Sequence, residues 1–181
     1  MEFLVTYRCT SRCEHCHVLT DDADAKIKHM DLGIARKAIK DAYDLFKIKT
    51  LMTFGGEPLL FPEFTCELHK YATELGIEKR QIITNGYFSN KIERIKQVVK
   101  LIKESGVNSI YISVDCFHEK HLDYKTVEKF LYELKKADIP IVRLHPAWVV
   151  NKQHENKYNY KTKETSRAFQ STHMEMFSLA K

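Results

Sequence analysis

Residues 50–84 read TLMTFGGEPLLFPEFTCELHKYATELGIEKRQIIT and contain one complete strand–helix–strand pattern. The stretch begins with a short apolar run, TLMTF, and ends with a second one, QIIT, and both runs are typical of strands. Between them, Pro62 suits the first turn of a helix, apolar residues follow at helical spacing, and Gly76 is a typical helix stop. This order predicts a βαβ unit with two parallel strands.

The same alternation extends in both directions from this unit. Further strand patterns occur at residues 3–7, 109–115 and 139–144, and helical patterns begin after Asp31, near Ile92 and near Val127. Five strands alternating with four helices predict an α/β fold whose parallel sheet either stays open or curls into a partial, TIM-like (β/α) barrel. Ligands of such folds bind at the carboxyl ends of the strands.

The pattern stops near residue 150. We therefore expect a core domain over residues 1–150 and a polar, weakly ordered tail over residues 151–181, because NKQHENKYNYKTKETSR contains no Leu, Ile or Val. The final stretch, AFQSTHMEMFSLAK, is compatible with a short amphipathic helix.

Composition excludes several classes of protein. The 181 residues are 44% hydrophobic with only six glycines and four prolines, which is ordinary for a globular protein. No apolar run approaches the length of a membrane helix, and the N-terminus lacks a basic signal region, so we expect a cytoplasmic protein. The net charge of +5 comes from interspersed charges of both signs, which makes nucleic-acid binding improbable.

Three of the five cysteines fall within eight residues, directly after the first predicted strand. Cys9, Cys13 and Cys16 have CxxxCxxC spacing, and three thiolates on a short loop can converge on zinc or on an iron–sulfur cluster. Zinc would need His15 or His17 to complete a Cys₃His set. The spacing favours iron–sulfur, because structural zinc usually takes its ligands as two separated pairs.

The cysteine motif, together with FGGEP at 54–58, TNG at 84–86 and SVD at 113–115, resembles the radical S-adenosylmethionine (SAM) superfamily over roughly residues 1–150. The resemblance implies a 4Fe–4S cluster held by Cys9, Cys13 and Cys16, with one iron open to SAM. It further implies reductive cleavage of SAM to a 5′-deoxyadenosyl radical that abstracts hydrogen from an unidentified substrate. An electron donor such as flavodoxin or ferredoxin would be a partner.

The resemblance also implies a SAM site that begins in the first two loops. His15 stands where the family usually has an aromatic residue touching the adenine, although a histidine there is equally compatible with a solvent-facing role. Gly55 and Gly56 allow the backbone to approach a ligand closely. Glu57 offers an acceptor for the SAM ammonium, and Pro58 fixes the turn into the next helix.

The other candidate residues follow the later strands. Ser113 matches the serine of the family that contacts SAM, and Asp115 is a candidate contact near the substrate. Arg143 is suited to pair with the SAM carboxylate, with a surface ion pair as the alternative. Thr84 and Asn85 are candidates for polar contacts and are equally typical of a turn. No residue of the sequence specifies the substrate or a catalytic group.

Two other interpretations remain open at this point. One is a non-catalytic zinc module, and the other is a truncated, inactive copy of a radical SAM protein, because the family barrel usually has six strands and this sequence predicts five. An open barrel edge would favour self-association or a C-terminal segment docked across it. Cys116 is expected to be a partly buried structural cysteine, with a second metal site near His118 or a thiyl role as the alternative, and Cys66 has no assigned role.

Overall fold

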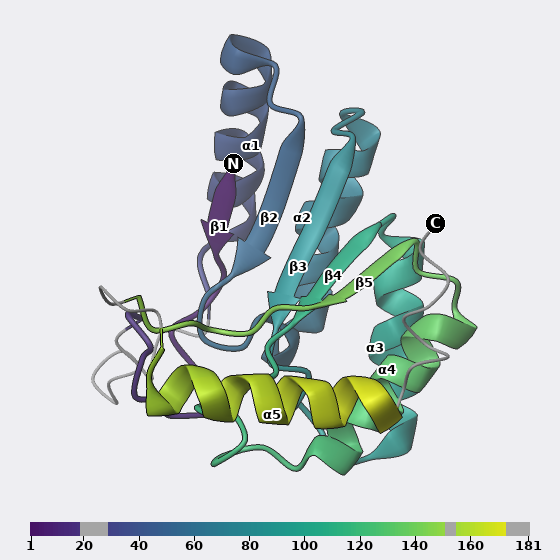
Figure 1. Cartoon of the computed structure of the whole chain (residues 1–181). Coiled ribbons are helices and arrows are strands. Elements are labelled where there is room, and N and C mark those ends of the chain that lie inside the picture. The colour runs from purple at the N-terminus through teal and green to yellow at the C-terminus, as the bar shows by residue number, and fades with distance from the viewer. Residues whose placement is uncertain (19–28, 151–154, 173–181) are drawn as a thin grey trace.

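Figure 1 shows the computed structural model, which describes residues 1–18, 29–150 and 155–172. One parallel sheet has the strand order β1-β2-β3-β4-β5, and among the described residues no further strand closes it into a barrel. The strands are β1 (Glu2–Leu4), β2 (Thr50–Phe54), β3 (Lys79–Thr84), β4 (Ser109–Ile112) and β5 (Ile141–Leu144). The predicted α/β class and the incomplete, barrel-like sheet are confirmed.

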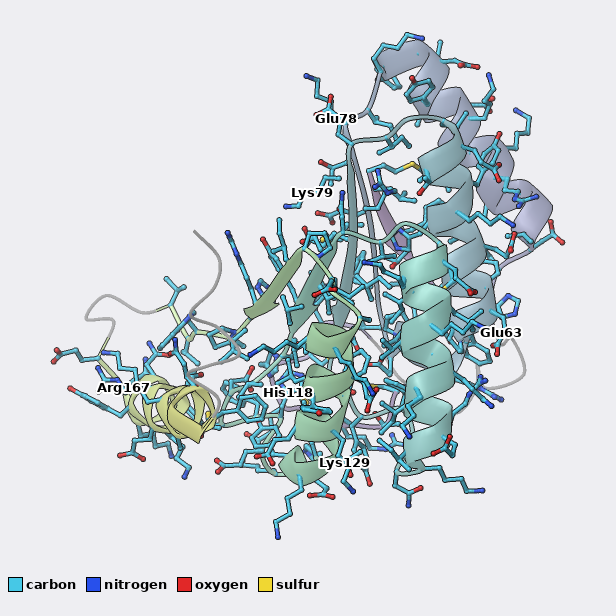
Figure 2. All side chains as sticks on the ribbon, turned by 90° about the vertical axis from the view of Figure 1, so that its right-hand side faces the viewer. Glu63, Glu78, Lys79, His118, Lys129 and Arg167 are labelled. Atoms are coloured by element: carbon cyan, nitrogen blue, oxygen red, sulfur yellow. The ribbon has the colours of Figure 1, made fainter. Side chains whose placement is uncertain are left out.

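Four helices alternate with the strands and cover one face of the sheet (Figures 1 and 2). They are α1 (Leu32–Phe46), α2 (Pro62–Glu74), α3 (Ile92–Glu104) and α4 (Tyr124–Lys136), with a short 3₁₀ helix, η2 (Pro58–Leu60), before α2. The expected start signals hold, since the Asp31 carboxylate accepts a hydrogen bond from the Ile34 N–H at 2.9 Å and Pro62 opens α2. No described helix is long and apolar enough to cross a membrane.

The core lies between this helical layer and the sheet. Ile82, Ile110 and Ile112 are fully buried and pack in one cluster with Val127 and Phe130 of α4. Because side chains alternate along a strand, Ile83 and Tyr111 project to the opposite face, which α1–α4 leave uncovered. The hydrophobic core therefore fixes which side chains remain available on the open side of the sheet.

The strands are shorter than their sequence patterns suggest. β4 ends at Ile112, so Ser113 and Asp115 lie in the loop after the strand and not on the strand itself. Backbone hydrogen bonds nevertheless continue past the strand ends, from the Val5 N–H to the Phe54 carbonyl and from the Ser113 N–H to the Thr84 carbonyl, both at 2.9 Å. These bonds fix the starts of the loops that carry the candidate site.

Residues 157–172 form a helix, α5 (Lys157–Thr172), where we expected weak order. The polar composition predicted weak order because it contains few apolar side chains, but α5 packs largely through hydroxyl groups. The Thr162 hydroxyl lies 3.4 Å from the Cys116 N–H, which donates to it, and the Ser166 hydroxyl donates to the Val114 carbonyl at 2.8 Å. Phe169 is a buried apolar anchor, only 4% exposed, and Tyr158 stacks on Phe117 with ring centroids 5.4 Å apart. The domain boundary near residue 150 stays a prediction.

α5 lies on the side of the sheet opposite to α1–α4, across the carboxyl ends of the strands (Figures 1 and 2). Asn159 also exchanges two hydrogen bonds with the backbone of Val149, at 2.8 and 2.9 Å, so the helix joins the segments that follow β4 and β5. We expected a docked C-terminal segment to lie across the β5 edge, whereas α5 docks across the carboxyl ends of the strands. Self-association through the β5 edge stays a prediction.

We expect Phe169→Ala to lower the free energy of unfolding by about 3 kcal/mol, because it removes a buried aromatic ring that packs on Tyr124. Tyr160→Ala is the matched control, since Tyr160 lies on the same helix but is 51% exposed, and it should change stability by less than about 0.5 kcal/mol. Urea denaturation measures both values. If both variants lost the same small amount of unfolding free energy, α5 would not be docked as described.

Candidate active site

A cavity of about 320 Å³ lies at the carboxyl ends of the strands, where all the sequence motifs meet. Its lining includes the three motif cysteines and seven of the ten other predicted site residues: His15, Gly55, Gly56, Thr84, Asn85, Ser113 and Asp115. Glu57, Pro58 and Arg143 do not line it. Residues separated by more than 100 positions therefore converge on one space, as the parallel topology predicts.

The cysteine loop places all three motif cysteines in the lining of this cavity. Burial raises the pKa of Cys9 to about 11 and that of Cys13 to about 12, and the neighbouring cysteine thiols contribute to both increases. The Cys9 sulfur accepts a hydrogen bond from the Ser11 N–H at 3.4 Å. Three soft donors that face one cavity and influence each other's ionisation fit a thiophilic metal centre, whose binding would remove the thiol protons.

Gly56 is required for the close approach of two loops. It has a φ of 47°, and a Cβ atom at this position would collide with the carbonyl oxygens of Arg8 and Thr6. The next residue donates its N–H to the Arg8 carbonyl at 2.7 Å. The second glycine of GGEP therefore lets the β2 loop pack directly against the start of the cysteine loop.

Glu57 is fully buried and lies outside the cavity lining. Its carboxylate accepts hydrogen bonds from the Thr84 hydroxyl at 2.7 Å, the Asn85 N–H at 2.8 Å and the Leu59 N–H at 2.9 Å. Burial raises its pKa to about 7 although these three donors lower it. This placement differs from the expected direct contact with the SAM ammonium, because the carboxylate is already engaged in holding Thr84 and Asn85.

Asn85 connects the β3 loop to the cysteine loop. Its side-chain amide donates to the Thr10 hydroxyl at 3.0 Å and lies 3.6 Å from the Cys9 sulfur, while its carbonyl oxygen accepts from the Tyr87 N–H at 2.8 Å. Asn85 is thus both a turn residue and a part of the cavity wall. Pro58, in contrast, is buried at the start of η2 and acts on the turn alone.

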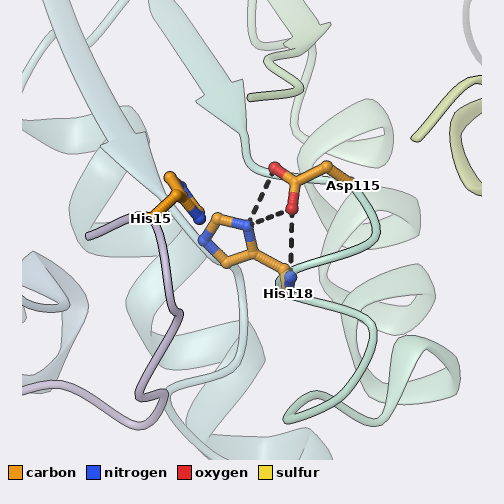
Figure 3. A group of neighbouring side chains, drawn as sticks. All are labelled: His15, Asp115 and His118. Atoms are coloured by element: carbon orange, nitrogen blue, oxygen red, sulfur yellow. Dashed lines mark hydrogen bonds and ion pairs between the residues drawn. The ribbon is translucent and has the colours of Figure 1, made fainter. Parts of the chain in front are cut away.

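Asp115 is fully buried and saturated with hydrogen bonds. Its carboxylate accepts from the backbone N–H groups of Phe117 and His118 at 3.0 Å and of Ala147 at 2.9 Å. Both carboxylate oxygens also lie 2.9 Å from Nδ1 of His118 (Figure 3). Burial alone would raise the pKa of Asp115, but the bonds and charge of His118 and the Ala147 N–H lower it to about 2.

His15 lies beside this pair, with its ring centroid 4.6 Å from that of Phe117 and 5.3 Å from that of His118. Desolvation lowers the pKa of His15, which favours the neutral imidazole. The flat ring predicted at this position is therefore present at the cavity, and its contact with adenine stays a prediction.

Arg143 does not reach the cavity. It is exposed on β5, opposite Tyr111 in the strand register, and the edge position leaves it facing solvent. His145, two residues further on the same face, lines the cavity instead, with its ring 5.5 Å from that of Tyr111. The predicted pairing of Arg143 with a ligand carboxylate has no support from this placement.

Two cavity residues, His118 and His145, were not among the predicted site residues. Alternation along the last strand places His145 on the same face as Arg143, near the opening, whereas the contact of His118 with Asp115 depends on the loop conformation after β4. The two cysteines outside the motif, Cys66 and Cys116, are buried, as predicted for Cys116.

An open α/β sheet with a three-cysteine loop at the carboxyl ends of its strands defines a metal- or cluster-binding protein of the barrel type. The family comparison makes this assignment specific, because residues 3–153 match the model of the radical SAM superfamily. The chain belongs to this superfamily, whose members use a 4Fe–4S cluster and SAM.

Individual relatives carry different activities. The chain is 29% identical over 134 residues to a GTP 3′,8-cyclase of Vibrio vulnificus, a match covering 72% of the chain and 37% of the cyclase. It is 27% identical over 138 residues to a Methanocaldococcus jannaschii protein that carries the name of a glycyl-radical enzyme activating enzyme, which covers 76% of the chain and 52% of that protein. The chain thus spans about 37% to 52% of the length of these relatives.

A solved structure supports the same fold. The crystal structure of HydG, a maturase of the [FeFe]-hydrogenase, superimposes with a TM-score of 0.63 and 15% sequence identity. The alignment covers 97% of this chain and 39% of HydG. This likeness supports the fold described above over nearly the whole chain.

We expect Asp115→Asn to lower the free energy of unfolding by roughly 2 kcal/mol at neutral pH, because the folded-state pKa of about 2 lies below the ordinary 3.8. The ionised carboxylate stabilises the fold above about pH 4, and this contribution is lost as the pH falls toward 2. The unfolding free energy of the variant should therefore not show this loss of stability between about pH 4 and pH 2.

Asp41→Asn is the control, since Asp41 forms an exposed ion pair with Lys37. This substitution should change the free energy of unfolding by less than about 1 kcal/mol. Urea denaturation at several pH values measures both effects. An unchanged acid profile in Asp115→Asn would contradict the hydrogen-bonded arrangement described for this carboxylate.

Proposed function

We propose that this chain is a radical SAM enzyme whose Cys9, Cys13 and Cys16 hold a 4Fe–4S cluster. The observation that carries the proposal is the convergence of these cysteines with the GGEP, TNG and SVD loops on one cavity. The relatives that share the superfamily are enzymes, but they perform different reactions, so the substrate of this chain is left unidentified.

The chemistry that a 4Fe–4S cluster and SAM supply together is reductive cleavage of the sulfonium to a 5′-deoxyadenosyl radical, which abstracts hydrogen from a substrate. The residues of the chain bind and orient the reactants around that chemistry. Gly55 and Gly56 bring the β2 loop beside the cysteine loop, and Ser113, Thr84 and Asn85 offer polar contacts to SAM.

Glu57 acts one step further from the ligand, as a positioning residue. Its buried carboxylate orients the hydroxyl of Thr84 and the backbone of Asn85, both of which line the cavity. We assign Asp115 to the part of the cavity that faces the substrate, together with His118, and we assign His15 to the adenine.

Two further candidates follow from specific observations. His15 and His17 line the same cavity as the cysteines, which is the arrangement a Cys₃His zinc module would use. The open, five-stranded sheet of the described residues favours a copy that binds its cluster without turnover. For an active enzyme, the partners would be SAM, an electron donor such as flavodoxin or ferredoxin, and the unidentified substrate. We also propose self-association at the β5 edge.

The experiment compares Cys13→Ala with Cys66→Ala after anaerobic reconstitution with iron and sulfide. We expect Cys13→Ala to lose most of its bound iron and all slow conversion of SAM to 5′-deoxyadenosine, because one of three ligands is missing. Cys66→Ala should retain both, because Cys66 is buried in the α2 core away from the cavity.

Iron analysis and mass spectrometry of the products measure the two effects. Wild-type iron content in Cys13→Ala would contradict the ligand assignment. A colourless wild-type protein with one equivalent of zinc would favour the zinc module, and intact SAM beside a full, reducible cluster would favour the inactive copy.

A further inference from the structure

His15, Asp115 and His118 form a compact group in the cavity that the cysteine cluster does not use (Figure 3). One potential ligand atom from each of the three side chains lies within 4.8 Å of the others. Two imidazoles and a carboxylate at this spacing are the donor set of a borderline divalent ion such as Zn²⁺ or Fe²⁺.

The hydrogen bonds decide which of these groups can be a direct ligand. Both oxygens of Asp115 already accept bonds from His118 Nδ1, and three backbone N–H groups also donate to this carboxylate. An ionised carboxylate can only accept, so Nδ1 of His118 must carry the proton. Nε2 of His118 is then the ring nitrogen that remains available to a metal ion.

The His118 ring presents this second nitrogen toward His15, whose ring points back toward it (Figure 3). A carboxylate that holds the far nitrogen of a histidine while the near nitrogen binds metal is the usual support of a metal-binding histidine. His118 is mostly buried, with 13% of its side chain exposed, so its direction is fixed by packing as well as by Asp115.

We propose that His15 and His118 form an open divalent transition-metal site, oriented by Asp115 through His118, whose remaining positions take water or an oxygen atom of the substrate. Metal–nitrogen bonds of about 2.0–2.1 Å require the two nitrogens to lie about 4 Å apart or closer. The ligand atoms already lie within 4.8 Å of one another, and His15 is exposed on the cysteine loop, so packing restrains its side chain less than that of His118.

An open site of this kind would bind and polarise an anionic or carbonyl oxygen within the same cavity as the cysteines. His15 would bind metal through its ring edge, which leaves the face of the ring free to stack. The proposal depends only on these three side chains, and it stands or falls independently of SAM cleavage.

The test titrates Zn²⁺ into protein with a reconstituted iron–sulfur cluster, so that the cysteines are occupied. A second sample, in which Cys9, Cys13 and Cys16 are all replaced by Ala, serves if the cluster does not assemble. We expect one bound zinc in either sample, with X-ray absorption showing nitrogen or oxygen ligands at about 2.0–2.1 Å and no sulfur at about 2.3 Å.

The variants His15→Gln and His118→Gln should lose this zinc, and Asp115→Asn should bind it about 10- to 100-fold more weakly. The control is His121→Gln, an exposed histidine three residues after His118 that should bind zinc as the wild type does. His15→Gln changes an exposed side chain and so keeps the test valid if the Asp115 variant fails to fold.

Absence of stoichiometric zinc in both samples would overturn the proposal. So would zinc that is bound equally by wild type and His118→Gln, or zinc with sulfur ligands. A wild-type protein that binds this zinc but does not cleave SAM would instead contradict the proposed function and leave the proposed metal site intact.

Discussion

The buried carboxylate of Glu57 is the interaction on which the geometry of the cavity depends. It accepts hydrogen bonds from Thr84, Asn85 and Leu59, and its own N–H donates to the Arg8 carbonyl. Three loops from the ends of β1, β2 and β3 are therefore joined at one residue that has no exposed surface. A buried acceptor with several donors is costly to disturb, which keeps the cysteine loop in register with the rest of the site.

The other half of the cavity depends on α5. Ser166 and Thr162 hold the backbone on either side of Asp115, and Asn159 holds the segment after β5. The part of the chain that the structure describes has no sixth strand at this position, so the helix takes over part of the support that a closed barrel would give. The loop that carries Asp115 and His118 is thus fixed by tertiary contacts and not by the sheet itself.

The sequence predicts the sheet well because alternating apolar runs and helix signals such as Asp31 and Pro62 are local features. It also predicts the cysteine loop, because three ligands on one loop need no knowledge of the fold. Arg143 lies outside the cavity lining, and its exposure depends on the edge position of β5, which the local sequence does not reveal. Helix α5 was missed because it packs through threonine and serine hydroxyls, and hydropathy does not detect such contacts. The same limit applies to His118, whose role arises from a loop conformation.

The most direct measurement of the central claim is the electron paramagnetic resonance spectrum of the reduced, cluster-loaded protein, recorded with and without SAM. In the proposed function, Cys9, Cys13 and Cys16 would leave one iron of a 4Fe–4S cluster open toward the cavity, so we predict a cluster signal that changes when SAM is added. The same change should persist in Cys66→Ala. A cluster signal that SAM leaves unaltered, or a protein that binds zinc and gives no cluster signal, would contradict the account.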